Sequence, residues 1–535
     1  MQISSSGSDR RFLIATVVVF ALLTIQLLRT AWVSDDAYIT FRVSDNVVNG
    51  LGAVWNTSER VQGYTHPLWF GVFTAFYALT RDAYYTCIAL GIVLTLGACA
   101  FLRRRIVDQP WPFLVAAAAL LSSKAFLDFS TSGLENPLSH LLILMFLWCW
   151  WRCADERRTL RLSLIASLCV LNRIDLVLLV GPAILVDVMR RGWRESWRPL
   201  LVGLTPLIAW EMFSVWYYAS LVPNTAFAKL NISMDLEEAV RRGYWYVRRT
   251  ALADPATLPV MLAAVAITAH SHWKRDWPLI GGLLASVLYL FWIGGDFMAG
   301  RFFSVPLVWS AAIVAASPVV RTRRAAAPLI AGIVVAGLLA PWEPALLSGY
   351  GYTPFDNFIR GRDDRGPRDN GLLITQHEIT DTRRYYFEGN ALLKGKLGDL
   401  RPDNPGVGDG LELRARGRQV VTRYAIGFTG YFAGPDVHIV DVLALTDPLL
   451  ARLPSIPGSR VGHYQRDIPA GYLESLQSGR NVIVDADLAE YYGRMQFAMA
   501  GPLFDARRSM TAVAFAFGRF DAARKRYIRK TWAGR

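Results

Sequence analysis

The chain has 535 residues, of which 53% are hydrophobic and 12% aromatic, and it carries a formal net charge of +14. Its apolar residues are gathered in runs long enough to cross a bilayer, and a soluble protein of this length is usually less apolar, so the class of soluble globular proteins is excluded. The excess positive charge lies mostly in short Arg clusters between these runs. This pattern indicates cytoplasmic loops and argues against nucleic acid as a partner.

The first predicted element is a transmembrane helix over residues 12–33. This run is long for the core of a signal peptide and has no clear small-residue cleavage site, so we expect it to be retained. A bilayer crossing takes about 20 mostly apolar residues. Further spans are predicted at 83–102, 111–127, 137–152, 160–171, 176–190, 199–218, 257–272, 277–293, 302–318 and 327–345. The pattern predicts a polytopic α-helical membrane domain of about eleven helices over residues 1–345.

Clusters of basic residues orient this bundle. They lie at 10–11, 103–105, 152–161, 190–198, 274–275 and 321–324. All fall on one side of the membrane if the N-terminus is cytoplasmic. The basic segment 241–249 lands outside and is interpreted as an amphipathic surface helix, which would also suit an anionic lipid headgroup. The apolar run 67–80 is placed on the outer surface, or made re-entrant, because a crossing there would put 103–105 outside.

The odd number of spans places residues 346–535 outside the cytoplasm. This part is rich in Gly, Pro, Asp and Arg, with short β-like runs at 437–442 and 481–484, and it predicts a soluble mixed α/β domain. The five cysteines all lie in or beside apolar runs of the N-terminal part, so the outer domain can hold no disulfide. No spacing of Cys and His predicts a zinc site, and no metal ligand is assigned.

Five unusual polar motifs all fall on the outer side. The first covers 34–42 and continues through 62–67. The other four cover 131–137, 172–175, 221–229 and 294–301. The orientation rests on Arg and Lys clusters alone, so the common side of these motifs is an independent observation. We therefore expect the functional site on the outer face.

The first motif places two carboxylates, Asp35 and Asp36, directly after the first span. Adjacent carboxylates repel each other, which should raise the pKa of one of them and suit it to proton transfer near neutral pH. Two alternatives stay open: the pair could cap a helix N-terminus, or it could hold a divalent cation. His66 in the same loop is a weaker candidate base, since a single His beside Pro67 is more often structural.

The other motifs also have structural interpretations. Glu135 could contact the N-terminal dipole of the next span, and 223–225 could be a capped turn. Segment 172–175 could be an exposed turn with a local ion pair, although Arg and Asp near membrane depth are expensive and favour a function. Asp296 and Arg301 could pair across a Gly-rich loop, whose glycines would also let the backbone approach a ligand closely.

Together these motifs resemble the C-type (GT-C) membrane glycosyltransferases, and within them the terminal arabinofuranosyltransferase group that acts on arabinogalactan and lipoarabinomannan. The residues that carry the resemblance are 35–39, 133–135, 223–225, 295–298, 300–301, 440–448 and 460–463. The chain departs from the pattern twice. Ile174 stands where Pro is expected, and Ala444 stands where Gly is common.

The resemblance implies a polyprenyl-phosphate sugar as donor and a glycan as acceptor, at the outer leaflet of the inner (plasma) membrane. It also implies a catalytic acidic residue in the first outer loop, where Asp35 and Asp36 match. A phosphate leaving group needs positive charge, and the outer-face candidates are Arg173, Arg301 and Lys229.

Aromatic side chains of the outer loops could stack on sugar faces or guide the lipid chain, and Tyr38 and Tyr64 are the main candidates. The other residues assigned to substrate binding are His66, Glu135, Asn224 and Asp296. The C-terminal domain is expected to help bind the acceptor.

The competing function class is a transporter or flippase of lipid-linked sugars, but the two similar halves typical of a transporter are not seen. A non-catalytic receptor or scaffold is a third class.

Overall fold

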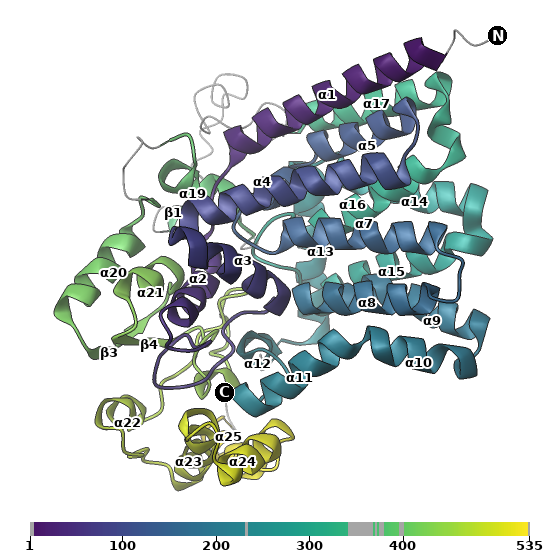
Figure 1. Cartoon of the computed structure of the whole chain (residues 1–535). Coiled ribbons are helices and arrows are strands. Elements are labelled where there is room, and N and C mark those ends of the chain that lie inside the picture. Colours follow the sequence, from purple (N-terminus) through teal and green to yellow (C-terminus); the bar gives the residue numbers. More distant parts are fainter. Residues whose placement is uncertain are drawn as a thin grey trace. The chain divides into compact units, whose positions relative to one another are not determined.

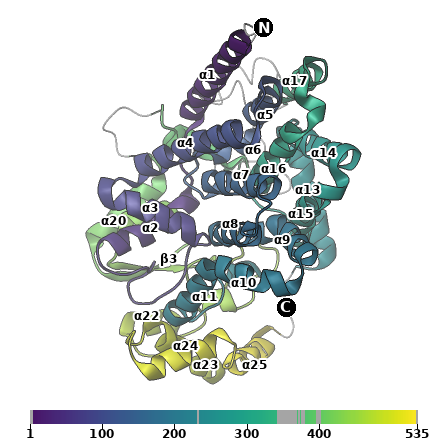
Figure 2. The ribbon, with the colours of Figure 1, turned by 45° about the vertical axis from the view of Figure 1, so that its right-hand side comes forward.

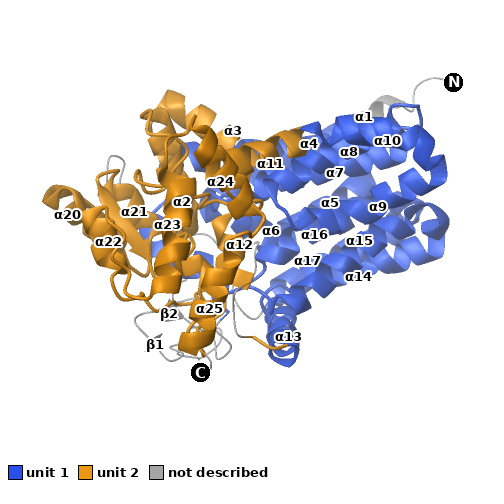
Figure 3. Cartoon of the chain, turned by 90° about the horizontal axis from the view of Figure 1, so that it is seen from below, with its two compact units in different colours: residues 1–34, 84–205, 236–402 blue, residues 35–83, 206–235, 403–535 orange. Residues whose placement is uncertain are grey.

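The computed structural model describes residues 5–230, 234–340, 368–369, 372–373, 379–394 and 401–532. The described chain is mostly helical and divides into two compact units (Figure 3). Unit 1 contains residues 1–34, 84–205 and 236–402, and unit 2 contains 35–83, 206–235 and 403–535. Each unit is therefore assembled from three separate pieces of the sequence. The predicted boundary between 345 and 346 lies outside the described residues.

Unit 1 is a bundle of helices joined by short loops (Figures 1 and 2). Its helices are α1 (Ser5–Thr30), α4 (Ala83–Phe101), η1 (Leu102–Ile106), α5 (Pro110–Ser122), α6 (Lys124–Phe129), α7 (Asn136–Arg152), α8 (Arg158–Asn172), α9 (Leu176–Arg191), α10 (Trp193–Gly203), α13 (Leu236–Ala253), α14 (Thr257–Ile267), η2 (Thr268–His272), α15 (Trp273–Trp292), α16 (Arg301–Ala316), η3 (Pro318–Arg321), α17 (Arg323–Leu338) and α19 (Thr382–Asn390). A two-stranded antiparallel sheet pairs β1 (Arg368–Asp369) with β2 (Leu372–Leu373).

Two helical segments of the described chain are long and apolar enough to cross a membrane, Phe12–Thr30 and Ala83–Ile106. Two bent pairs pass the same test together: Trp193–Gly203 with Thr205–Tyr218, and Leu236–Ala253 with Thr257–Trp292. Within the described residues, two to four spans are supported by length and composition, so the predicted eleven are not confirmed. The physical reason is helix length, because runs such as α5 and α16 fold as helices of 13 and 16 residues. The last predicted span, 327–345, extends beyond the described residues.

Unit 2 combines short helices with one pair of strands (Figure 1). Its elements are α2 (Asp35–Val48), α3 (Pro67–Thr80), α11 (Thr205–Tyr218), α12 (Asn224–Leu230), α20 (Pro405–Arg416), β3 (Gln419–Arg423), α21 (Gly427–Ala433), β4 (Val437–Asp441), η4 (Leu450–Arg452), α22 (Tyr472–Ser478), α23 (Ala486–Ala500), α24 (Ala506–Ala516) and α25 (Asp521–Trp532). Strands β3 and β4 are parallel, with Gln419 opposite Val437, and α21 connects them.

The predicted strand at 437–442 is confirmed as β4, whereas the run 481–484 is wrong as a strand. It precedes α23 without regular structure, and the side-chain amide of Asn481 donates to the carbonyl of Ala489 instead. A β-like composition predicts a strand only where a partner strand is available, and none pairs with this run among the described residues.

A buried arginine joins the first piece of unit 2 to its last piece. Arg42 on α2 is 2% exposed, and its guanidinium donates to the carbonyls of Trp55, Gly430 and Val437 at 2.7–2.9 Å. The same group lies over the ring of Trp55, 4.2 Å from its centroid. These contacts satisfy a buried charge with three carbonyl acceptors, so residues 35–83 fold as part of the same core as β4 and α21.

Candidate functional site

The first carboxylate of the pair, Asp35, caps a helix that is distant in sequence. Its two oxygens accept the backbone N–H groups of Gly427, at 3.1 Å, and Phe428, at 2.7 Å, in the first turn of α21. A side chain at position 427 would overlap the main-chain carbonyl of Asp35, so only glycine allows this close approach. Burial raises the pKa of Asp35 to about 6, the bond from Phe428 opposes this rise, and the neighbouring Asp36 adds to it.

The second carboxylate, Asp36, follows in the first turn of α2 and is half-buried. The helix-cap interpretation therefore applies to Asp35, although the helix that it caps is α21 rather than its own. Asp35 thus has a structural function that would persist without any substrate.

Tyr38 is a core residue of unit 2. It is 1% exposed and packs against Phe428 and Tyr431, with ring centroids 4.7 and 5.2 Å apart. Its ring faces are covered by protein, so this placement gives no support to a role in stacking on a sugar.

Tyr64 and His66 are buried in the same way. Tyr64 is 2% exposed, stacks on Phe70 at 4.2 Å, and its hydroxyl lies 2.9 Å from that of Tyr218. His66 precedes α3, and its Nε2 lies 2.8 Å from the hydroxyl oxygen of Thr40. His66 thus holds the loop before α3 against α2, and Tyr64 holds it against α3 and α11.

Asn224 links two of the motifs that carry the family resemblance. Its side-chain amide donates to the carbonyls of Ala444, Leu445 and Asp447 at 3.0–3.2 Å. Its Oδ1 accepts a bond from Arg452 at 3.2 Å. The N–H donors of this buried amide are thus all directed at the 440–448 loop, and its oxygen accepts from Arg452 just beyond that loop.

The 440–448 loop is itself closed by a buried carboxylate. Asp441 accepts the N–H groups of Leu443 at 2.9 Å and Thr446 at 3.1 Å, and burial raises its pKa to about 7. Ala444 has a φ of +62°, in the left-handed region that favours glycine. This backbone conformation explains why glycine suits that position in the resembling group. Sequence reasoning did not single out Asp441, and its only signal was the resemblance of the loop that contains it.

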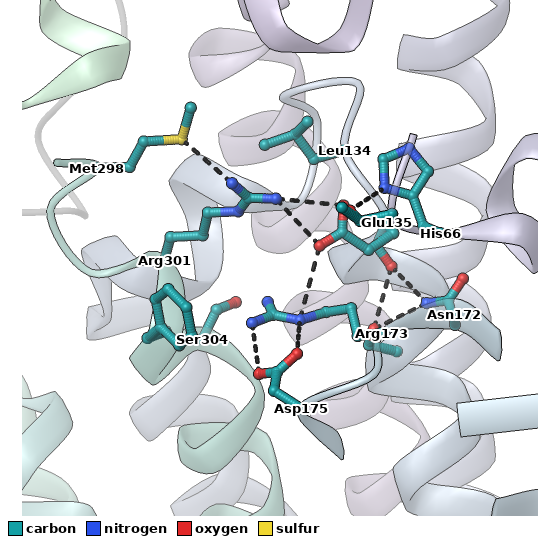
Figure 4. A network of polar contacts seen from close by, with 12 residues as sticks. His66, Leu134, Glu135, Asn172, Arg173, Asp175, Met298, Arg301 and Ser304 are labelled. Carbon is teal, nitrogen blue, oxygen red and sulfur yellow. Dashed lines mark hydrogen bonds and ion pairs between the residues drawn. The ribbon is translucent and has the colours of Figure 1, made fainter. Parts of the chain in front are cut away.

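In unit 1, three of the outer motifs meet at one buried ionic cluster (Figure 4). Glu135 precedes α7 and is 1% exposed. Its Oε1 lies 3.2 Å from Nη2 of Arg301, at the start of α16, and 3.6 Å from Nε of Arg173, between α8 and α9. The motifs 131–137, 172–175 and 294–301 therefore contribute to one site.

The two arginines of this cluster differ in their partners and in their exposure. Arg173 is held in a bidentate pair with Asp175, at 3.0 and 2.7 Å, and its guanidinium lies over the ring of Phe302, 5.2 Å from the centroid. Arg301 also contacts Glu135 and lies 3.8 Å from the sulfur of Met298, and its side chain is 13% exposed. Figure 4 shows both guanidinium groups turned toward Glu135. Arg301 is the more accessible of the two.

The backbone of Glu135 is fixed from the next helix. Asn172, the last residue of α8, is fully buried and donates its side-chain amide to the carbonyl of Glu135 at 3.0 Å and to the hydroxyl of Ser139 at 2.8 Å. A proline at 137 fits the first turn of α7, where its missing N–H costs nothing. The carboxylate is therefore held by a rigid turn rather than by a flexible loop.

Asp296 belongs to the same loop as Arg301 but does not form the predicted pair with it. One carboxylate oxygen accepts the N–H of Phe297 at 2.9 Å, and the other has no hydrogen-bond partner among the described residues, although Asp296 is 5% exposed. The loop is fixed by Tyr246, whose hydroxyl donates to the carbonyl of Met298 at 3.0 Å. A buried, half-satisfied carboxylate is costly and indicates a place for a hydroxyl or another donor.

The remaining predicted cation, Lys229, is exposed near the end of α12 in unit 2. It is not part of the unit 1 cluster.

The basic segment 241–249 forms part of α13, and Tyr246 within it is fully buried, so that helix has a packed face as well as an exposed one. Within the described ranges, no three His, Cys, Asp or Glu side chains are grouped so that they could hold a metal ion.

No family model matches the chain. It is similar to a protein of Mycobacterium tuberculosis named terminal beta-(1->2)-arabinofuranosyltransferase, with 26% identity over 528 residues that cover 82% of this chain and 81% of that protein. A protein of the same name from Corynebacterium glutamicum is 27% identical over 514 residues, covering 81% and 72%. These relatives confirm the resemblance to the terminal arabinofuranosyltransferase group.

Among solved structures, the chain is similar to the arabinosyltransferase EmbB from Mycobacterium smegmatis, with 17% identity and a TM-score of 0.37. That match covers 57% of this chain and 30% of EmbB. It is too partial for a shared fold to be inferred from it.

Proposed function

We propose that this chain is a membrane glycosyltransferase that moves arabinofuranose from a polyprenyl-phosphate donor to a glycan acceptor at the outer face of the plasma membrane. The observation that carries the proposal is the similarity, over about four fifths of the chain, to two proteins that share the name of that activity. The helical segments Phe12–Thr30 and Ala83–Ile106 are long and apolar enough to hold the protein in a bilayer. A polyprenyl chain partitions into the same bilayer, so enzyme and donor would meet there.

Asp36 is the proposed catalytic base. The acceptor hydroxyl oxygen forms a bond with the anomeric carbon, the bond from that carbon to the phosphate oxygen breaks, and the hydroxyl proton passes to Asp36. Polyprenyl phosphate leaves. Asp35 is the weaker candidate because its two oxygens already accept backbone N–H groups of α21, and a base must direct its lone pair at the substrate.

The donor phosphate is proposed to bind at Arg301. A phosphate oxygen would replace one oxygen of Glu135 on the guanidinium, in a charge-assisted contact of the same kind. Arg173 is less available because Asp175 binds it through two parallel contacts. The displaced oxygen of Glu135 is then available to accept a hydrogen bond from a sugar hydroxyl, as is the carboxylate oxygen of Asp296 that has no partner among the described residues. Lys229 stays the third proposed cation.

The test is direct transfer by the purified protein in lipid nanodiscs. Radiolabelled polyprenyl-phosphate arabinofuranose and an arabinan acceptor should give labelled glycan and an equal amount of polyprenyl phosphate. Empty nanodiscs provide the background. A transporter or flippase would instead redistribute the labelled donor between the leaflets of a sealed vesicle without forming product. That outcome, or the absence of transfer to any arabinan acceptor, would contradict the proposal.

A further inference from the structure

A second charged site lies in unit 1, at a cavity that contains none of the outer-face motifs. The cavity has a volume of about 170 Å³. Four arginines line it: Arg105, Arg152, Arg275 and Arg321. Each comes from a different element, namely η1, the last residue of α7, the first turn of α15 and the last residue of η3. These elements are far apart in the sequence, so the arginines are gathered by the fold and not by a local run of basic residues.

The charges at this cavity are not balanced by the acids that face it. Arg275 is paired with Asp276, at 2.9 and 2.7 Å. Among the described residues that line the cavity, the only acid is Asp108, which leaves an excess of guanidinium over carboxylate. Guanidinium groups that line one cavity repel one another unless an anion lies between them, and this repulsion favours binding of an anion.

The wall of the cavity is fixed by a second set of contacts. Asp276 is 2% exposed and accepts the indole N–H groups of Trp150, at 3.1 Å, and Trp151, at 3.2 Å. Trp151 itself lines the cavity, together with Trp148 and small apolar residues at 315–316. The lining of the site therefore combines charged side chains with apolar and aromatic ones. This combination suits a phosphate group that is attached to a less polar body.

We propose that this cavity binds a phosphate monoester or diester through Arg105, Arg152 and Arg321. Guanidinium groups present paired N–H donors whose geometry matches phosphate oxygens. The four arginines belong to four of the clusters that the positive-inside pattern places on the cytoplasmic side, where anionic phospholipid headgroups and soluble phosphorylated compounds are both available. The ligand chemistry is the same for either source, and the site is separate from the proposed transfer reaction.

The test compares the protein with a double variant, Arg152→Gln with Arg321→Gln. Its matched control is Arg194→Gln with Arg198→Gln, which removes the same charge at exposed positions of α10 that do not line the cavity. One arm measures retention of phosphatidylglycerol by native mass spectrometry after extraction from phosphatidylcholine and phosphatidylglycerol nanodiscs. The other arm measures the shift in unfolding temperature caused by glycerol phosphate or inorganic phosphate in neutral detergent.

We expect at least tenfold weaker binding of one probe in the cavity variant and unchanged binding in the control. Loss of phosphatidylglycerol retention identifies a lipid headgroup, and loss of the temperature shift identifies a soluble phosphate compound. Equal binding in the wild type and the cavity variant would overturn the proposal, as would an equal loss in the control. In either case the arginines would act only as solvated cytoplasmic charges. Sugar transfer is not part of this readout, so its outcome is independent of the proposed function.

Discussion

The polar motifs of unit 2 and those of unit 1 are satisfied in different ways. In unit 2, Asp35 binds backbone N–H groups of α21, and Asn224 binds three backbone carbonyls of the 440–448 loop. In unit 1, the carboxylate of Glu135 instead contacts the side chains of Arg173 and Arg301.

This difference distinguishes residues that stabilise the fold from residues whose side-chain partner a ligand can replace. A side chain bonded to backbone has a partner that cannot leave, so its removal leaves buried polar groups unsatisfied. A side chain bonded to another side chain can exchange that partner for a ligand group that carries the same charge as the partner. We therefore expect substitutions at the backbone-bound positions to lower stability, and substitutions in the ionic cluster to lower activity more than stability.

The largest expected effect on stability is at Asn224. Asn224→Asp keeps the shape of the side chain but removes the N–H donors, leaving the carbonyls of Ala444, Leu445 and Asp447 opposite a carboxylate oxygen. We expect a loss of about 3 kcal/mol in the free energy of unfolding, measured as a lower unfolding temperature. The control is Asn49→Asp at an exposed position of the same unit, which should change stability by less than about 0.5 kcal/mol. Equal unfolding temperatures for the two variants would contradict the structural role of Asn224.

A smaller effect, on activity, is expected at Arg301. Arg301→Gln removes a charge-assisted phosphate contact worth about 1.5–3 kcal/mol, so kcat/KM for the donor should fall by about tenfold or more. The KM for the acceptor should stay unchanged. Arg173→Gln is the comparison, because it leaves the half-buried Asp175 without its cation and the buried Glu135 with Arg301 alone, and it should lower the unfolding temperature as well. If Arg301→Gln changes only stability, the ionic cluster is structural and the distinction between the units fails.

The smallest effect concerns the pH dependence of stability at Asp35. Burial raises its pKa from 3.8 to about 6, so the folded protein holds this proton more tightly than the unfolded chain does. The resulting stabilisation is present at low pH and is lost as the pH rises through about 6. We expect the stability of the wild type relative to Asp35→Asn to decrease by about 1 kcal/mol between about pH 5 and pH 7. A difference that is constant, or that grows with pH, would show that the hydrogen bonds from α21 outweigh burial.

Part of the fold and of the candidate site could be predicted from the sequence. The apolar runs at 12–33 and 83–102 correspond to helices long enough to cross a membrane, and the family resemblance agrees with the relatives. The grouping of motifs 131–137, 172–175 and 294–301 on one side also anticipated the cluster around Glu135. These predictions rest on hydropathy, charge and short motifs, all of which are local properties of a sequence.

The division into units could not be predicted in this way. The bonds from Gly427 and Phe428 to Asp35 join residues separated by 392 and 393 positions, and no local pattern records such a contact. Asn224 and Tyr38 are predicted from the sequence as substrate ligands. An unusual polar or aromatic residue in a loop does not reveal whether it contacts a substrate or a distant part of the protein. The number of spans is also not settled by apolar runs alone, because several of them form helices shorter than the roughly 20 residues that a bilayer crossing takes, such as α5 and α16.

The central claim is that Asp36 has a catalytic function and Asp35 a structural one, and the transfer rates of Asp35→Asn and Asp36→Asn test it most directly. Both variants should be compared with the wild type in the same nanodiscs, after their unfolding temperatures show that they are folded. We predict that Asp36→Asn lowers the transfer rate by at least about a hundredfold, the lower end of a general-base effect, whereas Asp35→Asn retains most of it. Near-normal transfer by Asp36→Asn, or loss of transfer in Asp35→Asn alone, would contradict the account.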